Sequence, residues 1–302
     1  MLNSWFIIAN PISGNHNFSS KWKQIQLLLD NSNINYSFAF TLFSKHEIEL
    51  VQNAIQKGFR NIISIGGDGT LHHVVNGVMK QRYVKTSDIT IAVIPLGTGN
   101  DWIKTYSIPK NIEKAITIIN HKKTILQDIG VIKTKNQIYS YFNNIAGIGY
   151  DGYTVKKLKK LKRFGSIAYL LSGLFSLLTY QKDRFKIIIN NNEIETTSLM
   201  TVFGICKFSG GGMKFTGNVN TSDGLLDISI IKNITFFDFI YNIRKLYNGS
   251  IIHHKKVETY KSNSITVIPQ NQETLIQADG ELIGNGTITV TIIKEAINFV
   301  IF

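Results

Sequence analysis

Residues 61–78 read N-I-I-S-I-G-G-D-G-T-L-H-H-V-V-N-G-V, and this stretch decides the fold of the N-terminal half. Its three isoleucines form a β-branched apolar run, which predicts a buried strand. Glycines then interrupt the strand, and from Thr70 onward apolar residues recur at helical spacing. Such an arrangement forms an anion site, because glycines let the backbone approach closely and the first N–H groups of the helix point at the bound charge. The stretch therefore predicts a phosphate-binding loop formed by Gly66, Gly67, Gly69 and Thr70.

Asp68 gives this loop a second property. The sequence indicates that its carboxylate lies inside the glycine turn, where it would repel a bare phosphate. A divalent cation between the carboxylate and the phosphate would remove this repulsion. The alternative is an ordinary turn, since Gly and Asp are common in turns. Three glycines, an acid and a threonine between a strand and a helix favour phosphate and metal binding.

The chain of 302 residues is long enough for two domains with cores of their own. Its formal net charge of +13 indicates anionic partners such as nucleotide phosphates, an acidic membrane surface or nucleic acid. The alternative is a lysine-rich solvated surface. The single cysteine, Cys206, cannot form an intrachain disulfide, which favours a reducing compartment. Residues 1–14 lack the pattern of a secretory signal.

The N-terminal part alternates between predicted strands and helices. The strands lie at residues 5–9, 36–41, 62–65 and 89–94, and the helices at 22–29, 48–55, 70–78 and 112–119. This alternation predicts a parallel α/β layer, in which ligands bind beyond the C-terminal ends of the strands. Asn10, Thr41 and the glycine turn at residues 66–70 all fall at that edge.

A second glycine loop follows the strand at residues 89–94 and reads P-L-G-T-G-N-D, residues 95–101. It supplies a hydroxyl, an amide and a carboxylate from Thr98, Asn100 and Asp101, next to Gly97. Asn100 or Asp101 could instead be a helix N-cap, which is the commonest role of these residue types. Two acid-bearing glycine loops at one sheet edge favour a shared nucleotide and metal site.

The sequence changes character near residue 124. Strands are predicted at residues 124–133, 138–146, 184–189, 193–203, 225–231, 261–269 and 274–282, with a hairpin turn at Asn190–Asn192 and a helix at 236–246. This half is therefore expected to be an antiparallel β-sandwich. Residues 287–302 are apolar and β-branched and are expected to return to the first domain. The predicted domains are residues 1–123 with about 290–302, and residues 124–289.

Residues 151–180 form a predicted helical insertion in the second domain. Six basic residues lie between Lys156 and Arg163, around an apolar stripe. They form either a solvated face or a surface that contacts anionic lipid. Residues 164–180 are rich in Leu and Phe and are expected to form a buried or cleft-lining helix, with a membrane span as the alternative at the lower length limit.

The predicted strand at residues 274–282 contains Asp279 and Glu281. Side chains two apart on a strand share a face, so these carboxylates are expected to project together. Paired carboxylates suit metal binding and proton abstraction. The alternative is an exposed acidic turn. The seven histidines show no metal-ligand spacing.

The chain resembles the diacylglycerol kinase-like lipid kinases in an ordered set of motifs. These motifs are N-P at residues 10–11, the two glycine loops, N-I-A-G at 144–147 and A-D-G-E at 278–281. The diacylglycerol kinase-like lipid kinases are soluble bacterial enzymes related to the catalytic domains of sphingosine and ceramide kinases. NAD kinases and phosphofructokinases share the first glycine loop alone. The resemblance implies an α/β nucleotide-binding domain, a C-terminal β-sandwich and an active site between them.

The resemblance also implies roles for individual residues. Thr41, residues 66–70 and Thr98 would bind ATP, with Asn10, Gly97 and Asn100 at the same edge. Asp68, Asp101 and Asp128 would surround a catalytic Mg²⁺, Glu281 would be the general base, and Asp279 would lie beside it. Asp223 would hold a structural Mg²⁺ with the backbone carbonyls of Asn220 and Leu225. His72 departs from the pattern, because many relatives carry Asn at that position.

The resemblance implies an ATP- and Mg²⁺-dependent kinase that phosphorylates a lipid hydroxyl such as that of diacylglycerol. Phosphatidylglycerol, a sphingoid base and a polyprenol are also open as acceptors. An NAD kinase-like enzyme and a non-catalytic protein that binds anionic lipid are the alternatives. We expect a cytoplasmic protein at the surface of an anionic membrane, possible homodimerisation and no nucleic-acid partner.

Overall fold

The computed structural model describes residues 4–13, 17–158, 173 and 175–302. The chain forms two compact units. The first contains residues 1–129 and 294–302, and the second contains residues 130–293.

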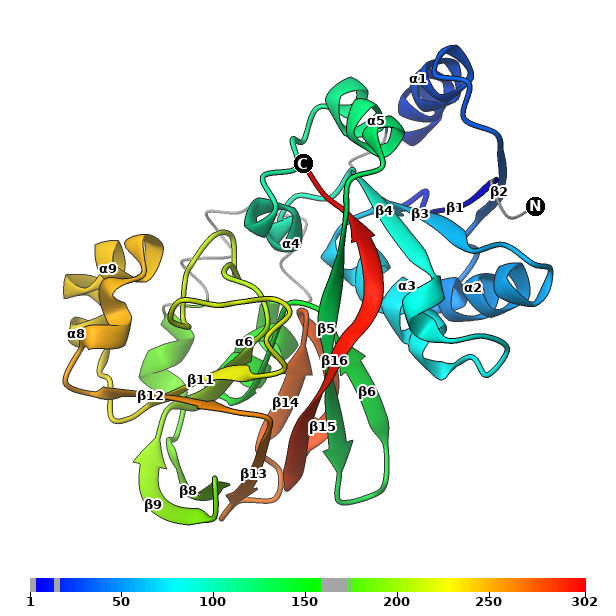
Figure 1. The fold of residues 1–302 in the computed structure, drawn as a ribbon. Helices are drawn as coiled ribbons and strands as arrows, with labels where there is room; N and C mark the ends of the chain where they lie inside the picture. Colours follow the sequence, from blue (N-terminus) through cyan, green and yellow to red (C-terminus); the bar gives the residue numbers. More distant parts are fainter. Residues whose placement is uncertain (1–3, 14–16, 159–172, 174) are drawn as a thin grey trace. The chain divides into compact units, whose positions relative to one another are not determined.

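The first unit is the predicted α/β layer. Parallel strands β1 (Trp5–Ala9), β2 (Tyr36–Phe40), β3 (Asn61–Gly66) and β4 (Thr90–Pro95) lie in the order β2-β1-β3-β4. The helices are α1 (Phe18–Asn31), α2 (His46–Gln56), α3 (Asp68–Lys80), the short α4 (Asp101–Thr105) and α5 (Ile112–His121), with a 3-10 turn η1 (Thr86–Asp88). Helices α1 and α5 pack together on one face of the sheet, and α2 and α3 pack together on the other (Figure 1).

Helices on both faces explain the composition of the central strand β3. Ile62, Ile63 and Ile65 are all fully buried, as expected for a parallel strand that is covered on both sides. Helix α3 begins at Asp68 and not at Thr70 as predicted. The earlier start has a physical reason, because an acidic side chain in the first turn stabilises the positive N-terminal end of a helix.

The second unit is built from antiparallel strands. One sheet has the order β16 (Ile288–Val300), β13 (Ser264–Pro269), β8 (Asp183–Ile189) and β9 (Asn192–Ser198), together with β5 (Thr124–Thr134) and β6 (Tyr139–Phe142). The other has the order β12 (Val257–Ser262), β11 (Leu226–Ile231), β10 (Met200–Gly204), β7 (Ile145–Gly149), β14 (Leu275–Ala278) and β15 (Glu281–Asn285). Asn190 and Asn191, both at positive φ, form the predicted hairpin turn between β8 and β9.

The two sheets share one core. Phe142, Phe185 and Ile265 from the first sheet are buried in the same cluster as Phe203 and Ile228 from the second. Facing sheets with interdigitated side chains define a sandwich. The predicted fold class, an α/β domain followed by an antiparallel β-sandwich, is confirmed.

Three predicted strands of the second unit are each divided where the chain crosses between the two sheets. The breaks fall at residues 143–144, at Leu199 and at Asn263. At each break the chain leaves one sheet and enters the other, from β6 to β7, from β9 to β10 and from β12 to β13. The residue pattern stays that of a strand across such a crossing, because both segments contribute to the same core.

The C-terminal strand pairs with strands of both units, and the predicted helix at residues 236–246 is interrupted. Strand β16 pairs with β13 in the second unit, and its last residues pair in parallel with β4 in the first unit. The predicted helix at 236–246 is divided into α8 (Phe236–Tyr241) and α9 (Ile243–Asn248), followed by a 3-10 turn η3 (Ser250–His253). Asn242 at the break has a non-helical backbone conformation.

The predicted helical insertion is only partly described. Helix α6 (Tyr150–Leu158) contains its beginning, and residues 173 and 175–179 are helical. The remaining residues of the basic stretch and of the expected cleft-lining helix lie outside the described residues. Within the described part of the chain, no helix is long and apolar enough to cross a membrane.

Candidate active site

The predicted nucleotide residues meet at one edge of the parallel sheet. Asn10, Thr41 and Gly67 directly follow β1, β2 and β3. Backbone hydrogen bonds continue the strand pairing into these loops, because Asn10 N–H donates to the carbonyl of Ile65 at 3.0 Å and Thr41 N–H to that of Ala9 at 3.0 Å. The loop after β4 is attached in the same way. The predicted convergence of these loops is therefore present within the first unit.

The two glycine loops are in direct backbone contact. The N–H of Gly97 donates to the carbonyl of Gly66 at 3.1 Å, and a Cβ atom added to Gly97 would lie 2.5 Å from the Cα atom of Gly67. Asn100 closes the second loop by donating from its side chain to the carbonyl of Gly97 at 2.6 Å. A Cβ atom at Gly66 would lie 2.3 Å from the Thr70 hydroxyl oxygen. Close packing therefore requires glycine at positions 66 and 97.

Asp68 links the two loops. Its carboxylate accepts hydrogen bonds from the backbone N–H groups of Asp101, at 3.1 Å, and Trp102, at 3.3 Å. These are the first residues of α4, so the side chain that begins α3 also caps α4. Helix N-termini stabilise a carboxylate in this position.

Glu47, a buried carboxylate that was not predicted from the sequence to take part, supports the same edge of the parallel sheet. The side-chain amide of Asn10 lies 3.3 Å from the Thr70 hydroxyl and 3.4 Å from a carboxylate oxygen of Glu47. The other carboxylate oxygen of Glu47 lies 3.6 Å from Nδ1 of His73. Glu47 is buried near the start of α2, and no sequence signal connects it with Asn10. His72 lies on the buried part of α3, with Nε2 3.3 Å from the amide nitrogen of Asn76.

The carboxylates expected around the catalytic Mg²⁺ are each bonded to protein donors. Asp101 pairs with the ammonium of Lys104 at 2.6 Å, and Asp128, which is fully buried, accepts from the backbone N–H of Glu295 at 2.7 Å. No group of three or more His, Cys, Asp or Glu in the described residues is arranged to hold a metal ion. Because Mg²⁺ is often bound through only one or two carboxylates plus substrate phosphates, Asp68 fits this mode, and Asp101 fits it once a metal displaces the Lys104 ammonium from its carboxylate. A cage of three carboxylates does not form among the described residues.

Asp279 and Glu281 do not lie on one strand, and this prediction of a shared face is wrong. Asp279 and Gly280 form the two-residue turn between β14 and β15, with φ values of 51° and 81°. Asp-Gly favours this type of turn because both positions need positive φ. The Asp279 carboxylate accepts from the N–H groups of residues 143, 144 and 145 at 3.0–3.2 Å. Asp279 thus anchors the turn, and Glu281 begins the next strand.

Asp151 and Gln277 form a hydrogen-bonded pair that was also not predicted from the sequence. The amide nitrogen of Gln277 donates to the Asp151 carboxylate at 2.5 Å, and its amide oxygen accepts from the N–H of Gly280 at 2.8 Å. Burial raises the pKa of Asp151 to about 6. These residues are 126 positions apart in the chain, so only the fold connects helix α6 with the turn that precedes Glu281.

The expected structural Mg²⁺ site beside Asp223 does not fit the residues present. The ammonium of Lys261 lies 3.3 Å from carboxylate oxygens of Asp223 and Asp227 and 3.4 Å from the carbonyl of Asn218. Burial lowers the pKa of Lys261, but the Asp227 and Asp223 carboxylates outweigh this effect and raise it. A Mg²⁺ among the same oxygens would be repelled by this ammonium.

The other groups of this loop are also engaged. Asp223 accepts from the backbone N–H of Leu225 at 3.0 Å, and the side-chain oxygen of Asn220 accepts from the N–H of Ser222 at 3.2 Å. The pairing of β11 with β12 sets Asp227 directly opposite Lys261. The positive charge expected from a metal is therefore supplied by a lysine on the neighbouring strand.

Comparisons with known proteins cover nearly the whole chain. Residues 4–132 match the family model of the diacylglycerol kinase catalytic domain, and residues 144–301 match that of the YegS C-terminal NAD kinase beta sandwich-like domain. The chain is 27% identical to a diacylglycerol kinase of Bacillus subtilis, covering 91% of this chain and 88% of the relative. It is 26% identical to a diacylglycerol kinase of Staphylococcus carnosus, covering 91% and 87%.

The fold has a counterpart among solved structures. The chain is similar to a crystal structure of a diacylglycerol kinase from Bacillus anthracis, with a TM-score of 0.76 and 22% sequence identity. The alignment covers 99% of this chain and 97% of that chain. At 22% sequence identity, this similarity shows a shared fold and no more.

Proposed function

Because this chain belongs to the diacylglycerol kinase-like lipid kinase family, we propose that it transfers the γ-phosphoryl group of ATP to the hydroxyl group of a lipid such as diacylglycerol. The observation that carries this proposal is the direct packing of two glycine loops at the C-terminal edge of the parallel sheet. Open α/β sheets bind nucleotides at this edge.

The nucleotide is bound mainly through backbone groups in this proposal. The N-terminal turn of α3, at residues 68–70, offers its N–H groups and helix dipole to the phosphates. Thr41 and Thr98 flank this turn from the loops after β2 and β4. Mg²⁺, when bound with ATP, neutralises charge on the transferred group, and Asp68 and Asp101 are the residues that would hold it.

Glu281 acts as the general base. The lipid hydroxyl gives its proton to Glu281 while its oxygen forms a bond to the γ-phosphorus, the bond from that phosphorus to the bridging oxygen breaks, and ADP leaves. Asp279 is a positioning residue, since its three backbone hydrogen bonds fix the turn directly before Glu281. Gln277 supports the same turn through Gly280.

A labelling experiment distinguishes the proposed lipid kinase from an NAD kinase-like enzyme and from a non-catalytic lipid-binding protein. The purified chain is incubated with γ-labelled ATP and Mg²⁺, together with diacylglycerol, phosphatidylglycerol, sphingosine or a polyprenol in detergent, or with NAD. We expect label in one lipid product in the organic phase. Label in NADP alone would establish an NAD kinase-like enzyme, and absence of ATP turnover with every acceptor would favour a non-catalytic lipid-binding protein.

The proposed lipid acceptor also determines where in the cell the enzyme must act. Diacylglycerol and the other candidate acceptors reside in bilayers, so the enzyme must reach a membrane surface to meet them. We therefore propose a cytoplasmic enzyme that associates peripherally with anionic membranes, in keeping with its net charge of +13.

A further inference from the structure

Helix α8 exposes an apolar face to solvent. Its sequence is F-F-D-F-I-Y, and Phe237, Ile240 and Tyr241 are 67%, 40% and 83% exposed. The opposite face carries Phe236 and Phe239, which pack against a buried cluster of the second unit. The helix is thus held to the unit by one aromatic face and presents a second one outward. Contiguous exposed apolar surface marks an interaction site more often than a random surface.

A neighbouring segment extends this apolar surface. Phe175 and Leu178, in the described helical residues 175–179, are 59% and 61% exposed. The ring of Phe175 stacks on that of Phe236 with 6.4 Å between the ring centroids, and the Phe236 ring in turn contacts the exposed Phe237 ring edge to face at 5.7 Å. Two separate segments of the second unit therefore contribute to one apolar surface, which we call the α8 surface: Phe175, Leu178, Phe237, Ile240 and Tyr241.

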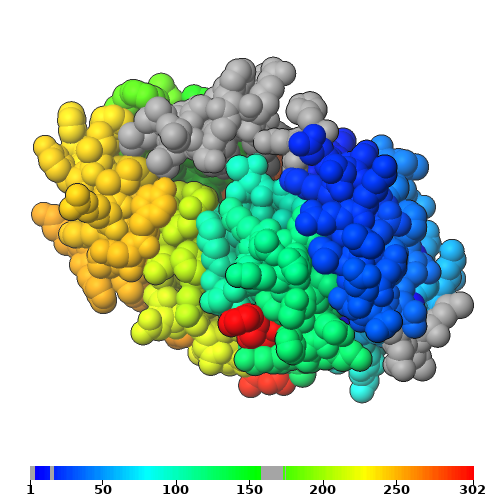
Figure 2. Space-filling view, turned by 90° about the horizontal axis from the view of Figure 1, so that it is seen from above, coloured from blue at the N-terminus to red at the C-terminus, as the bar shows by residue number. Residues whose placement is uncertain are grey.

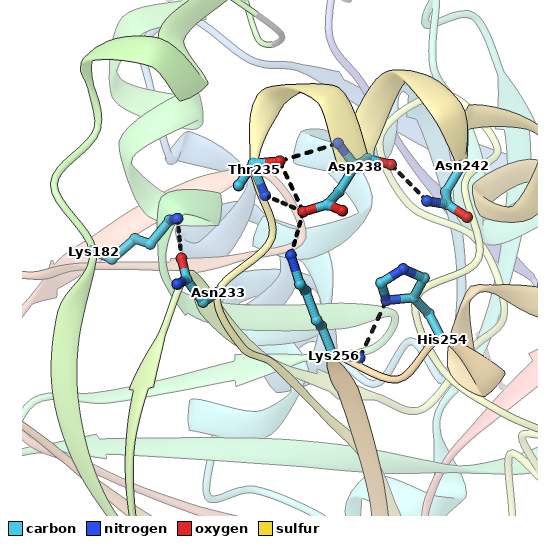
Figure 3. A network of polar contacts seen from close by, with 7 residues as sticks. All are labelled: Lys182, Asn233, Thr235, Asp238, Asn242, His254 and Lys256. Atoms are coloured by element: carbon cyan, nitrogen blue, oxygen red, sulfur yellow. Dashed lines mark hydrogen bonds and ion pairs between the residues drawn. The ribbon is translucent and has the colours of Figure 1, made fainter.

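Asp238, the only acidic residue between positions 232 and 256, is bonded to neighbouring groups of the protein. Asp238 accepts from the ammonium of Lys256 at 2.5 Å and from the N–H and hydroxyl of Thr235 at 2.8 Å each (Figure 3). These bonds, that of Lys256 first, hold the pKa of Asp238 well below its usual range. Its negative charge is therefore compensated inside the helix cap.

Exposed positive charge follows α8 closely in the chain. Arg244 and Lys245 on α9 and Lys255 after it are exposed, and the yellow to orange atoms that include these helices form one continuous stretch of surface in Figure 2. A pocket of about 370 Å³ adjoins the end of α9, with Lys207 and Lys214 in its lining. Exposed aromatic rings beside cations, with no uncompensated acid between positions 232 and 256, match the interface of an anionic bilayer.

We propose that the α8 surface docks on anionic phospholipid bilayers, with Phe237 and Tyr241 entering the interfacial region and Arg244, Lys245 and Lys255 attracted to the lipid headgroups. The inference rests on the proposed function, because a bilayer-resident acceptor requires such a surface. Aromatic side chains favour the membrane–water interface, since each combines an apolar ring with a more polar edge or hydroxyl. The occupant is a lipid bilayer and not a protein partner, because exposed cationic side chains, and no uncompensated acidic one, accompany the exposed rings in this part of the chain.

The test measures cosedimentation with vesicles of phosphatidylglycerol and phosphatidylcholine. The double variant Phe237→Ser with Tyr241→Ser should bind about tenfold or more weakly, while thermal unfolding stays near that of the parent. The matched control replaces Ile138 and Tyr139, which are also exposed in the second unit, by serine. This control should bind as the parent does. Phe237→Trp should retain binding, because it keeps an interfacial aromatic ring.

Charge is tested in the same assay. Arg244→Gln, Lys245→Gln and Lys255→Gln together should remove most of the salt-sensitive part of binding. The control changes three other exposed lysines, Lys57, Lys85 and Lys135, to glutamine. Equal weakening by both triple variants would overturn the assignment of this surface. Equally tight binding of the parent to pure phosphatidylcholine vesicles would overturn the anionic character.

Activity on detergent-dispersed acceptor separates this inference from the proposed function. The α8 variants should keep parental activity in detergent and lose activity on vesicles. Loss of both activities together would show that α8 serves the fold or the chemistry and would overturn docking. If the parent phosphorylates no lipid in detergent, the proposed function fails, while vesicle binding still reports on the α8 surface alone.

Discussion

The carboxylate of Asp68 accepts a hydrogen bond from the backbone N–H of Asp101 at 3.1 Å, so the first glycine loop fixes the start of the helix after the second. This acid therefore has a structural role in addition to the proposed role at Mg²⁺. Replacing it should change the relative position of the two loops.

Asp68→Ala should abolish kinase activity and lower the free energy of unfolding by about 1–2 kcal/mol, the typical cost of losing a helix cap. Asp68→Asn keeps one capping oxygen and loses the charge, so it should restore most of the stability and little of the activity. Urea denaturation and labelled-ATP turnover measure the two effects. Full activity of Asp68→Asn at saturating Mg²⁺ would contradict the metal role.

Gly97→Ala should separate the glycine loops, because its Cβ atom would lie 2.5 Å from the Cα atom of Gly67. We expect a loss of about 1–3 kcal/mol in stability, typical of overpacking, and weaker ATP binding measured by calorimetry. Gly217→Ala is the control, since its Cβ atom would have no neighbour closer than 3.8 Å. Unchanged ATP affinity in Gly97→Ala would show that the contact between the loops is not needed for nucleotide binding.

Glu281→Gln should lower kcat by about 10²–10⁴-fold, the usual contribution of a general base, with little change in stability or ATP affinity. Asp279→Asn should instead lower the free energy of unfolding by about 1–3 kcal/mol, because backbone N–H groups lose a charged acceptor. Steady-state kinetics and urea denaturation on both variants distinguish the base from the positioning residue. A decrease in kcat below threefold for Glu281→Gln would assign the base elsewhere.

Lys261→Met should destabilise the second unit by about 1–3 kcal/mol, since the nearly buried Asp227 would lose its compensating charge. Added Mg²⁺ should then raise the Tm of the variant and leave that of the parent unchanged. Lys186→Met is the matched control, because Lys186 also pairs with a carboxylate across two strands and its side chain is 41% exposed against 42% for Lys261. An equal Mg²⁺-dependent rise in the parent would restore the metal site expected at Asp223.

Asp151→Asn should change the pH dependence of stability. The folded-state pKa of about 6 exceeds the value of about 3.9 for an unperturbed Asp. Between these values the folded state binds a proton that the unfolded state does not, so the free energy of unfolding rises as the pH falls through this window. The variant should lack this rise and be more stable than the parent at pH 7.5 by about 1–3 kcal/mol.

Urea denaturation at pH 5 and pH 7.5 measures the difference. The exposed Asp88 provides the control, since Asp88→Asn should leave the parental pH profile unchanged. Identical profiles for the parent and Asp151→Asn would mean that the carboxylate is hydrated in the folded protein.

The sequence by itself determined the class of each half and the position of the nucleotide edge. Local signals were sufficient there, because β-branched runs such as Ile62–Ile65, glycine turns and helical spacing are properties of consecutive residues. Parallel strands point the same way, so residues that follow them, such as Asn10 and Thr41, necessarily reach one edge. The Asn190–Asn191 turn was predictable for the same reason, since its conformation depends on its own residues.

The tertiary structure decided everything that depends on residues far apart in the chain. Residues 274–282 were expected to form one strand, yet Asp279 and Gly280 turn the chain, and the Asp279 carboxylate reaches N–H groups more than 130 positions away. Lys261 meets Asp223 and Asp227 only because β11 pairs with β12 in a particular register. The exposed face of α8 likewise follows from which of its two aromatic faces packs on the core. Periodicity gives the faces of an element, but pairing and packing energies determine which groups those faces meet.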